Sequence, residues 1–222
     1  MKNRTFSKNI ADAINSFLTE DDWNYTFDDQ RGLFKFNLNI KGRIKKVSYI
    51  IAVKDDDYIV YTASPLGADD DKTMAVMAEF ICHVNYGVKN GNFELDMMDG
   101  EIRYKCFVDC EGITPSKEMI RNSIYCPAAM FNRYGPGIVD ILFCNATAKE
   151  AVDKCEKSLA EALIANLGKE LDGDADMDAI ISRLAALFGI DEGELHGDNE
   201  EADADDETKT GSDLFGSEGG VA

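Results

Sequence analysis

The segment from residue 68 to Tyr86 constrains the fold most, because it predicts a helix that is apolar on two sides. One stripe has the spacing of a helix that lies on a sheet: Met74, Met77, Ala78, Ile81 and Cys82. A second stripe runs down another side and consists of Val76, Phe80 and Val84. Only a narrow polar strip remains, so we expect this helix to be buried on more than one side.

The first stripe should contact the chain's own strands, and the second stripe needs another cover. One interpretation is that a helix predicted after Thr114 covers Val76, Phe80 and Val84. The other is that a protein partner or a second copy of the chain binds there, which makes these three residues the candidate partner-binding site. If the stripe is covered within the chain, the next surfaces to consider are the sheet face and the C-terminal helix.

Alternating apolar and polar residues on both sides of this helix predict antiparallel strands. Before the helix, the expected strands cover residues 23–27, 34–40, 44–53 and 58–63. After it, residues 93–97 and 102–110 should form a hairpin with Asp99-Gly100 as its two-residue turn. The sequence therefore predicts an α+β fold, in which a meander of three to four antiparallel strands, a helix and a hairpin form a sheet packed with helices.

Several further helices are expected. The N-terminal segment is amphipathic, with apolar positions at Phe6, Ile10, Ile14 and Phe17. Thr114-Pro115 has the pattern of an N-cap followed by the first helical residue, and we expect Pro127 and Gly135-Pro136-Gly137 to kink or interrupt that helix. Thr147 and Glu150 fit a capping box at the start of the next helix.

Three parts of different composition follow one another along the chain. Residues 1–168 should form the α/β domain, residues 169–190 a linker with a short amphipathic helix, and residues 191–222 a disordered acidic tail. The net charge is −19, and the tail contributes strongly because it holds 12 acidic residues and one Lys. Nucleic acid is not an expected ligand, since phosphate binding depends on clustered Lys and Arg. No long apolar run predicts a membrane span and no signal peptide is recognised, so we expect a cytoplasmic protein.

No catalytic, cofactor-binding or metal-binding residue is identified. The six cysteines contain no CxxC pair and are interpreted as small buried apolar residues in a reducing compartment. Only two histidines are present, and the sequence contains neither a GxSxG motif nor a phosphate-binding glycine loop. Alternating aspartates from Asp172 to Asp178 resemble a calcium loop, but Met177 and Arg183 stand where such a loop needs Gly and Glu.

The order of elements, together with particular residues, resembles the YbjN family. These are bacterial proteins described as sensory transduction regulators, with a fold similar to that of type III secretion chaperones. The resemblance spans roughly residues 3–155 and rests on residues 23–27, 61–65, 83–86, 91–96 with Asp99-Gly100, and 134–138. It implies a domain that binds other proteins, either a different protein or a second copy in a homodimer. It carries over no catalytic residue.

Two functions therefore remain open. The first is a non-enzymatic protein-interaction module, chaperone-like or regulatory, without cofactor. The alternative is a small-molecule-binding protein or an unrecognised enzyme with a pocket between sheet and helices. The alternative predicts a concave site with converging carboxylates or cysteines of perturbed pKa. Methionines could serve either the core or an adaptable binding surface: Met74, Met77, Met97, Met98, Met119 and Met130.

Overall fold

A six-stranded antiparallel sheet organises the part of the chain that the computed structural model describes, residues 6–158. Its strands run in the order β1-β2-β3-β4-β6-β5. Their bounds are β1 Tyr25–Asp28, β2 Leu33–Asn39, β3 Lys46–Val53, β4 Asp57–Gly67, β5 Asn92–Leu95 and β6 Glu101–Asp109. The first four strands form the predicted meander, and the β5–β6 hairpin joins the sheet by pairing β6 with β4.

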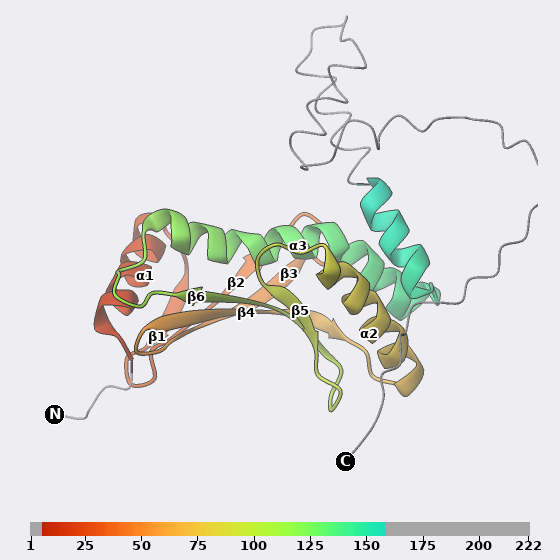
Figure 1. Cartoon of the computed structure of the whole chain (residues 1–222), viewed down its shortest axis with the longest axis horizontal. Helices are drawn as coiled ribbons and strands as arrows, with labels where there is room; N and C mark the ends of the chain where they lie inside the picture. Colours follow the sequence, from red (N-terminus) through yellow and green to blue (C-terminus); the bar gives the residue numbers. More distant parts are fainter. Residues whose placement is uncertain (1–5, 159–222) are drawn as a thin grey trace, which may run out of the picture. The chain divides into compact units, whose positions relative to one another are not determined.

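The helices lie together on one side of the sheet, which gives the predicted α+β fold (Figure 1). Three of them are α1 Lys8–Glu20, α2 Asp71–Tyr86 and α3 Lys117–Cys144, and a fourth covers residues 148–158. Helix α3 runs along the upper face in Figure 1, α1 lies at the left-hand end and contacts α3, and α2 packs on β5 and α3 near the right-hand end. Within residues 6–158, no helix lies over the face turned away from α3.

Period-two alternation decides which side chains enter the core. In β3, every second residue is buried: Val47, Tyr49, Ile51 and Val53. In the N-terminal segment, all four apolar positions expected from the sequence are buried: Phe6, which precedes α1, and Ile10, Ile14 and Phe17 on it. The core is thus a single layer of apolar side chains between one sheet face and the helices.

Helix α3 corrects two expectations. It runs without a break through Pro127 and Pro136 for 28 residues. Its N-cap is Ser116 rather than Thr114, because the Ser116 hydroxyl accepts a hydrogen bond from Met119 N at 3.2 Å. Burial of one face along the helix outweighs the hydrogen bonds that the two prolines remove.

The glycines of this helix have a packing role instead of a breaking role. A Cβ at Gly137 would lie 2.8 Å from the Phe80 ring and 3.0 Å from Cys155 Sγ. A Cβ at Gly135 would approach the Ile44 side chain to 3.3 Å. Gly137 therefore lets α2 and the helix over residues 148–158 approach α3 closely.

The hairpin turn also differs from the expectation. A loop of four residues, 97–100, connects the two strands of the hairpin. The last pair before the loop is Asp96 and Glu101, where Asp96 N donates to Glu101 O at 2.9 Å. Within this loop, only Gly100 has a positive φ, of 75°. A Cβ at Gly100 would lie 1.7 Å from the Ala68 carbonyl oxygen. The glycine is needed for this close approach, and the predicted two-residue turn at Asp99-Gly100 is wrong.

Two local contacts fix the ends of the helices. The Asn85 side chain bonds both the N–H and the carbonyl of Phe93 at 2.9 Å, which ties the end of α2 to β5. The capping box is confirmed, because Thr147 N donates to Glu150 Oε2 at 2.9 Å and Glu150 N to Thr147 Oγ1 at 3.3 Å. The linker, the short helix of residues 177–188, the aspartate run and the acidic tail lie outside the described residues.

Candidate functional site

The proposed partner-binding stripe of α2 lies largely inside the core. Phe80 and Val84 are 0% and 1% exposed, and Val76 is half-buried. The Phe80 ring packs edge-to-face on Tyr134 of α3, with centroids 6.3 Å apart. Placing Phe80 and Val84 on a free partner surface is therefore wrong, and cover by the helix after Thr114 is confirmed.

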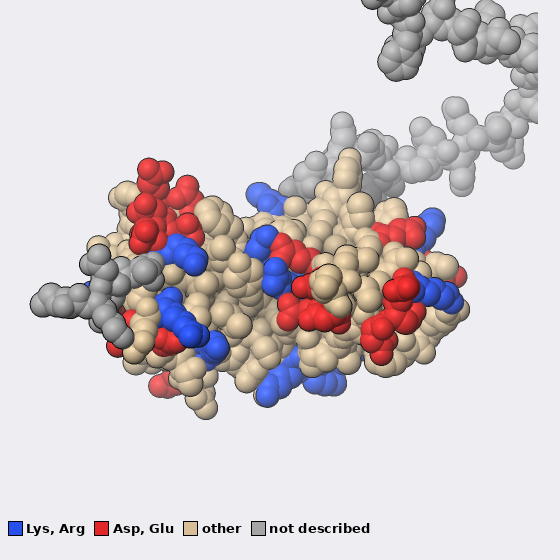
Figure 2. All heavy atoms as spheres, turned by 90° about the horizontal axis from the view of Figure 1, so that it is seen from below, with Lys and Arg blue, Asp and Glu red and all other residues tan. Residues whose placement is uncertain are grey.

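The uncovered sheet face is the alternative surface. Its side chains alternate with the core residues along the same strands, and two of them are exposed large apolar groups, Ile50 at 39% and Phe107 at 55%. Half-buried neighbours extend the apolar area: Leu33, Ala52, Ile59 and Tyr61. Together these six residues form what we call the open-face patch. Figure 2 looks onto this face and shows uncharged atoms between separate charged groups.

Strand register brings the patch together from four strands. One cross-strand row aligns Leu33, Ala52, Ile59 and Phe107. The next row aligns Lys35, Ile50, Tyr61 and Lys105. Directly opposed side chains in a sheet are close enough to touch, so the two rows make one continuous surface.

The charges around the patch are unevenly distributed. Lys35 and Lys46 are exposed on this face and make no ion pair within residues 6–158. At the opposite strand ends lie acidic side chains: Asp28, Asp57 and Asp109. On β2 and β3, Lys35 and Lys46 therefore lie away from the end where the aspartates gather, whereas on β6 Glu101 lies at the same strand end as Lys46.

A salt-bridge cluster on the hairpin borders the patch. Glu94 of β5 receives hydrogen bonds from Lys105 Nζ and from Arg103 Nε, the latter at 2.8 Å. Partial burial opposes ionisation of Glu94, but these two cations outweigh it and hold its pKa below the ordinary value. Arg103 also lies over the Tyr61 ring, 4.9 Å from its centroid. The cluster thereby positions Tyr61 at the rim of the patch.

The hairpin tip adds exposed methionines beside this face. Met97 and Met98 are 60% and 91% exposed, whereas Met77 is buried and Met74 and Met130 are half-buried. The hairpin extends below the sheet, on the side away from α3 (Figure 1). Met97 and Met98 can therefore contact a molecule on the open side, and Met77 belongs to the core.

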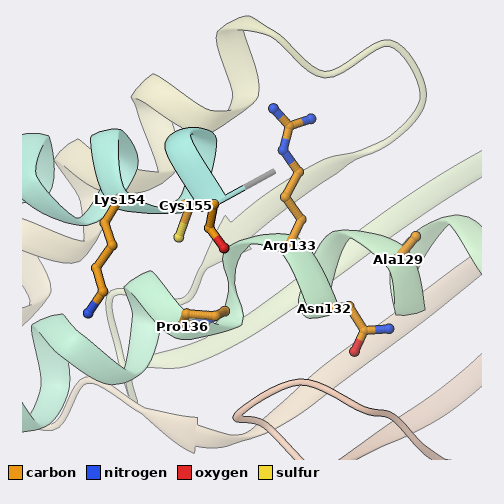
Figure 3. Close-up of a pocket in the computed structure, with 7 residues that line it drawn as sticks. Ala129, Asn132, Arg133, Pro136, Lys154 and Cys155 are labelled. Carbon is orange, nitrogen blue, oxygen red and sulfur yellow. The ribbon is translucent and has the colours of Figure 1, made fainter. Parts of the chain in front are cut away.

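Two hollows are relevant to the small-molecule alternative. A shallow hollow of about 500 Å³ lies over β1–β3 on the open face, with Lys35, Ser48 and Ile50 among its lining residues. A second, of about 430 Å³, lies between α3 and the fourth helix and is lined by Ala129, Asn132, Arg133, Pro136, Lys154, Cys155 and Ser158 (Figure 3). Arg133 and Lys154 point in opposite directions in Figure 3, so they do not converge on a common ligand.

The cysteines only partly follow the sequence interpretation. Cys106, Cys110 and Cys155 are buried, but Cys82 and Cys144 are exposed. Cys106 interacts with the half-buried Cys126 and both have perturbed pKa values, yet neither lines either of these two hollows. The thiol pair is thus of the kind that the alternative function predicts, but it lies outside these two hollows.

The described part of the chain contains neither a cluster of metal-ligating side chains nor a membrane-spanning helix. No group of three or more His, Cys, Asp or Glu side chains in residues 6–158 is arranged to hold a metal ion. Within the same range, no helix is both long and apolar enough to cross a membrane.

The open-face patch was not identified from the sequence, although part of its signal is visible there. The alternation in β6 shows that Phe107 shares a face with Arg103 and Lys105. That Phe107 aligns with Ile59, Ala52 and Leu33 depends on the register of four strands, which a single strand does not reveal.

Comparison with known proteins adds no relative. No protein-family model matches the chain, and neither a curated protein nor a solved structure matches it significantly. The resemblance to the YbjN family and to type III secretion chaperones therefore stays a prediction.

Proposed function

We propose that this chain is a non-enzymatic interaction module that binds an apolar, acidic segment of another protein on the open-face patch. The observation that carries the proposal is the apolar surface that residues 6–158 leave uncovered on the side of the sheet away from α3, at Ile50, Phe107 and their row neighbours. Contiguous exposed apolar surface with a polar rim is typical of protein-binding sites.

The exposed apolar groups supply the affinity in this proposal. Full burial of one large apolar side chain contributes about 1.5–3 kcal/mol. Phe107 retains more than half of its surface for contact, and Ile50 more than a third. The methionines at the hairpin tip would add flexible apolar contacts that adapt to the bound segment.

Charge complementarity selects an acidic occupant. Lys35 stands in the same cross-strand row as Ile50 and Tyr61, and it has no carboxylate partner in residues 6–158. Acidic side chains of a bound segment would meet Lys35 and Lys46 and avoid the end where Asp57 and Asp109 face each other. The segment should therefore bind in one direction, with its carboxylates over Lys35 and Lys46 of β2 and β3 and away from Glu101 of β6.

The test places a photo-cross-linking amino acid at position 107 of the full chain in living cells. Mass spectrometry then identifies the attached segment, and its synthetic peptide is titrated against purified protein. We expect a peptide with Asp or Glu beside apolar residues. Phe107→Ala should weaken its binding about tenfold to a hundredfold, and Lys35→Glu should remove most of its salt dependence. Phe143→Ala is the matched control, because Phe143 is 68% exposed on α3, away from this face.

Three results would overturn the proposal. One is equal peptide affinity for Phe107→Ala and the parent chain. Another is a Phe107-dependent dimer in light scattering, which would make a second copy the occupant. The third is saturable binding of a metabolite in the hollow over β1–β3 that excludes the peptide, which would favour the small-molecule alternative.

The chaperone-like or regulatory role, the YbjN relationship and the cytoplasmic location belong to this proposal as well. The role and the relationship rest on the residue resemblance and are consistent with the α+β fold, and the location rests on the sequence, which predicts neither a membrane span nor a signal peptide. The same cross-linking experiment addresses them, because the identity of the attached protein shows which pathway and compartment the chain serves.

A further inference from the structure

Two thiols meet where β6 packs on α3. Cys106 of β6 is fully buried, and Cys126 of α3 is half-buried. Both contact the short connection between α2 and β5. The Cys126 thiol donates to the Asn90 carbonyl at 3.5 Å, and a Cβ on Gly91 would lie 2.9 Å from Cys106 Sγ. Residues 90 and 91 thus hold both sulfur atoms in one small region.

The two thiols are electrostatically unequal. A hydrogen bond from Cys106 lowers the pKa of Cys126 to about 7, although burial opposes this. The same interaction, together with burial, raises the pKa of Cys106. Cys126 is therefore the thiol that loses its proton more readily, and in its protonated form it donates to Asn90.

We propose that Cys126 and Cys106 form a peroxide-reactive dithiol, in which Cys126 is oxidised first and Cys106 then closes a disulfide between α3 and β6. Accessibility sets this order, because Cys126 is half-buried and Cys106 is fully buried, so that a small oxidant reaches Cys126 first. The site is independent of protein binding on the open face.

Each step is balanced with hydrogen peroxide as the oxidant. The Cys126 thiolate attacks one peroxide oxygen, the O–O bond breaks, and hydroxide leaves and is protonated to water. Cys126 is then a sulfenic acid, oxidised by two electrons. Cys106 attacks its sulfur, the S–O bond breaks, a second water leaves with the Cys106 proton, and the S–S bond forms.

Peptide mapping of the full-length protein tests the proposal. After stoichiometric hydrogen peroxide and blocking of free thiols, tryptic digestion without reductant should yield residues 106–117 linked to residues 122–133, lighter by two hydrogen atoms. Because Cys110 shares the first peptide, Cys110→Ser is used as the background and should leave the product unchanged. Cys106→Ser should stop the reaction at a sulfenic acid on Cys126 that dimedone labels.

Alkylation of the unmodified chain gives a second readout that needs no variant of the core. Iodoacetamide should label Cys126 about threefold to tenfold faster than Cys82 at pH 7, although Cys82 is the more exposed thiol. Faster labelling of Cys82, or oxidation of Cys126 to sulfinic acid without the linked peptide in the Cys110→Ser background, would overturn the proposal.

Discussion

The two faces of the sheet use the same strands for different purposes. The helix-facing side buries residues such as Phe34, Tyr49 and Ile51 to 1% exposure or less. The open side, one residue out of step, leaves Ile50 and Phe107 in contact with solvent. The comparison shows that alternation alone does not distinguish a face that stabilises the fold from a face that can bind a partner. The elements that cover a face decide which of these two roles the face has.

Polar groups sharpen this difference. On the covered face, the Tyr49 hydroxyl donates to the Ile124 carbonyl at 2.9 Å, and the Tyr58 hydroxyl lies 3.0 Å from Ser123 Oγ. Burial is the main cause that raises the pKa of both tyrosines, and it raises that of Tyr58 to about 12. Both hydroxyls therefore stay protonated, and their contacts position α3 over β3 and β4. On the open face, the polar contact between Ser48 and Asn37 remains in solvent.

The largest expected effect comes from the stripe that α3 covers. Phe80→Ala should lower the free energy of unfolding by about 3–5 kcal/mol, because it leaves a cavity between α2 and α3. Urea denaturation of the full chain measures this, with Phe143→Ala expected to stay within about 0.5 kcal/mol. Unchanged stability with an altered oligomeric mass would instead return Phe80 to a partner surface.

Adjacent isoleucines test the two faces directly. Ile51 is fully buried and Ile50 is 39% exposed, although they are neighbours in β3. We expect Ile51→Ala to cost about 2–4 kcal/mol and Ile50→Ala about 1 kcal/mol or less, mainly through strand propensity. Matched urea transitions of the two variants give the comparison, and equal losses would mean that the open face is covered in the free protein.

A buried carboxylate at the edge of the helical layer should have a smaller effect. Asp140 of α3 accepts hydrogen bonds from Lys154 Nζ at 2.5 Å and from Arg43 of the β2–β3 connection. Asp140→Asn should lower stability by about 1–3 kcal/mol at pH 7. Asp153→Asn, which affects an exposed pair with Lys149, should cost about 0.5 kcal/mol or less.

The pH dependence of this effect has a definite sign. The hydrogen bond from Lys154, aided by Arg43, holds the pKa of Asp140 below its ordinary value. A depressed folded-state pKa contributes stability that is complete above the unfolded pKa, near 3.9, and is lost as the pH falls through the folded value. The difference between the parent chain and Asp140→Asn should therefore shrink in acid, and a difference that grows on acidification would contradict this assignment.

Local patterns predicted the elements well because each element carries its own evidence. Alternation identified the meander and the buried face of β6, helical spacing identified α1 and α2, and the Thr147 capping box is formed as expected. These features depend on residues close together in sequence. They survive in the fold because local preference and burial agree there.

The errors concern contacts between distant segments. Gly135 and Gly137 were interpreted as breaks, but their meaning depends on Ile44 and Phe80, which lie far away in sequence. The cover over Phe80 and the apolar rows of the open face likewise require the position of α3 and the register of four strands. A single sequence defines which residues could pair, whereas the folded packing selects which of them do.

The smallest effect should come from the charges beside the patch. Glu94→Gln removes the partner of Arg103 and Lys105, but both cations retain access to water, at 40% and 33% side-chain exposure. We expect a loss of about 0.5 kcal/mol that disappears in high salt, measured by urea denaturation at two NaCl concentrations. Glu101→Gln, which removes only a 3.6 Å contact with Arg103, should change stability still less. A salt-independent loss above about 2 kcal/mol would show that the cluster holds the open face together, whereas a small screened loss leaves it the role of orienting Tyr61 for binding.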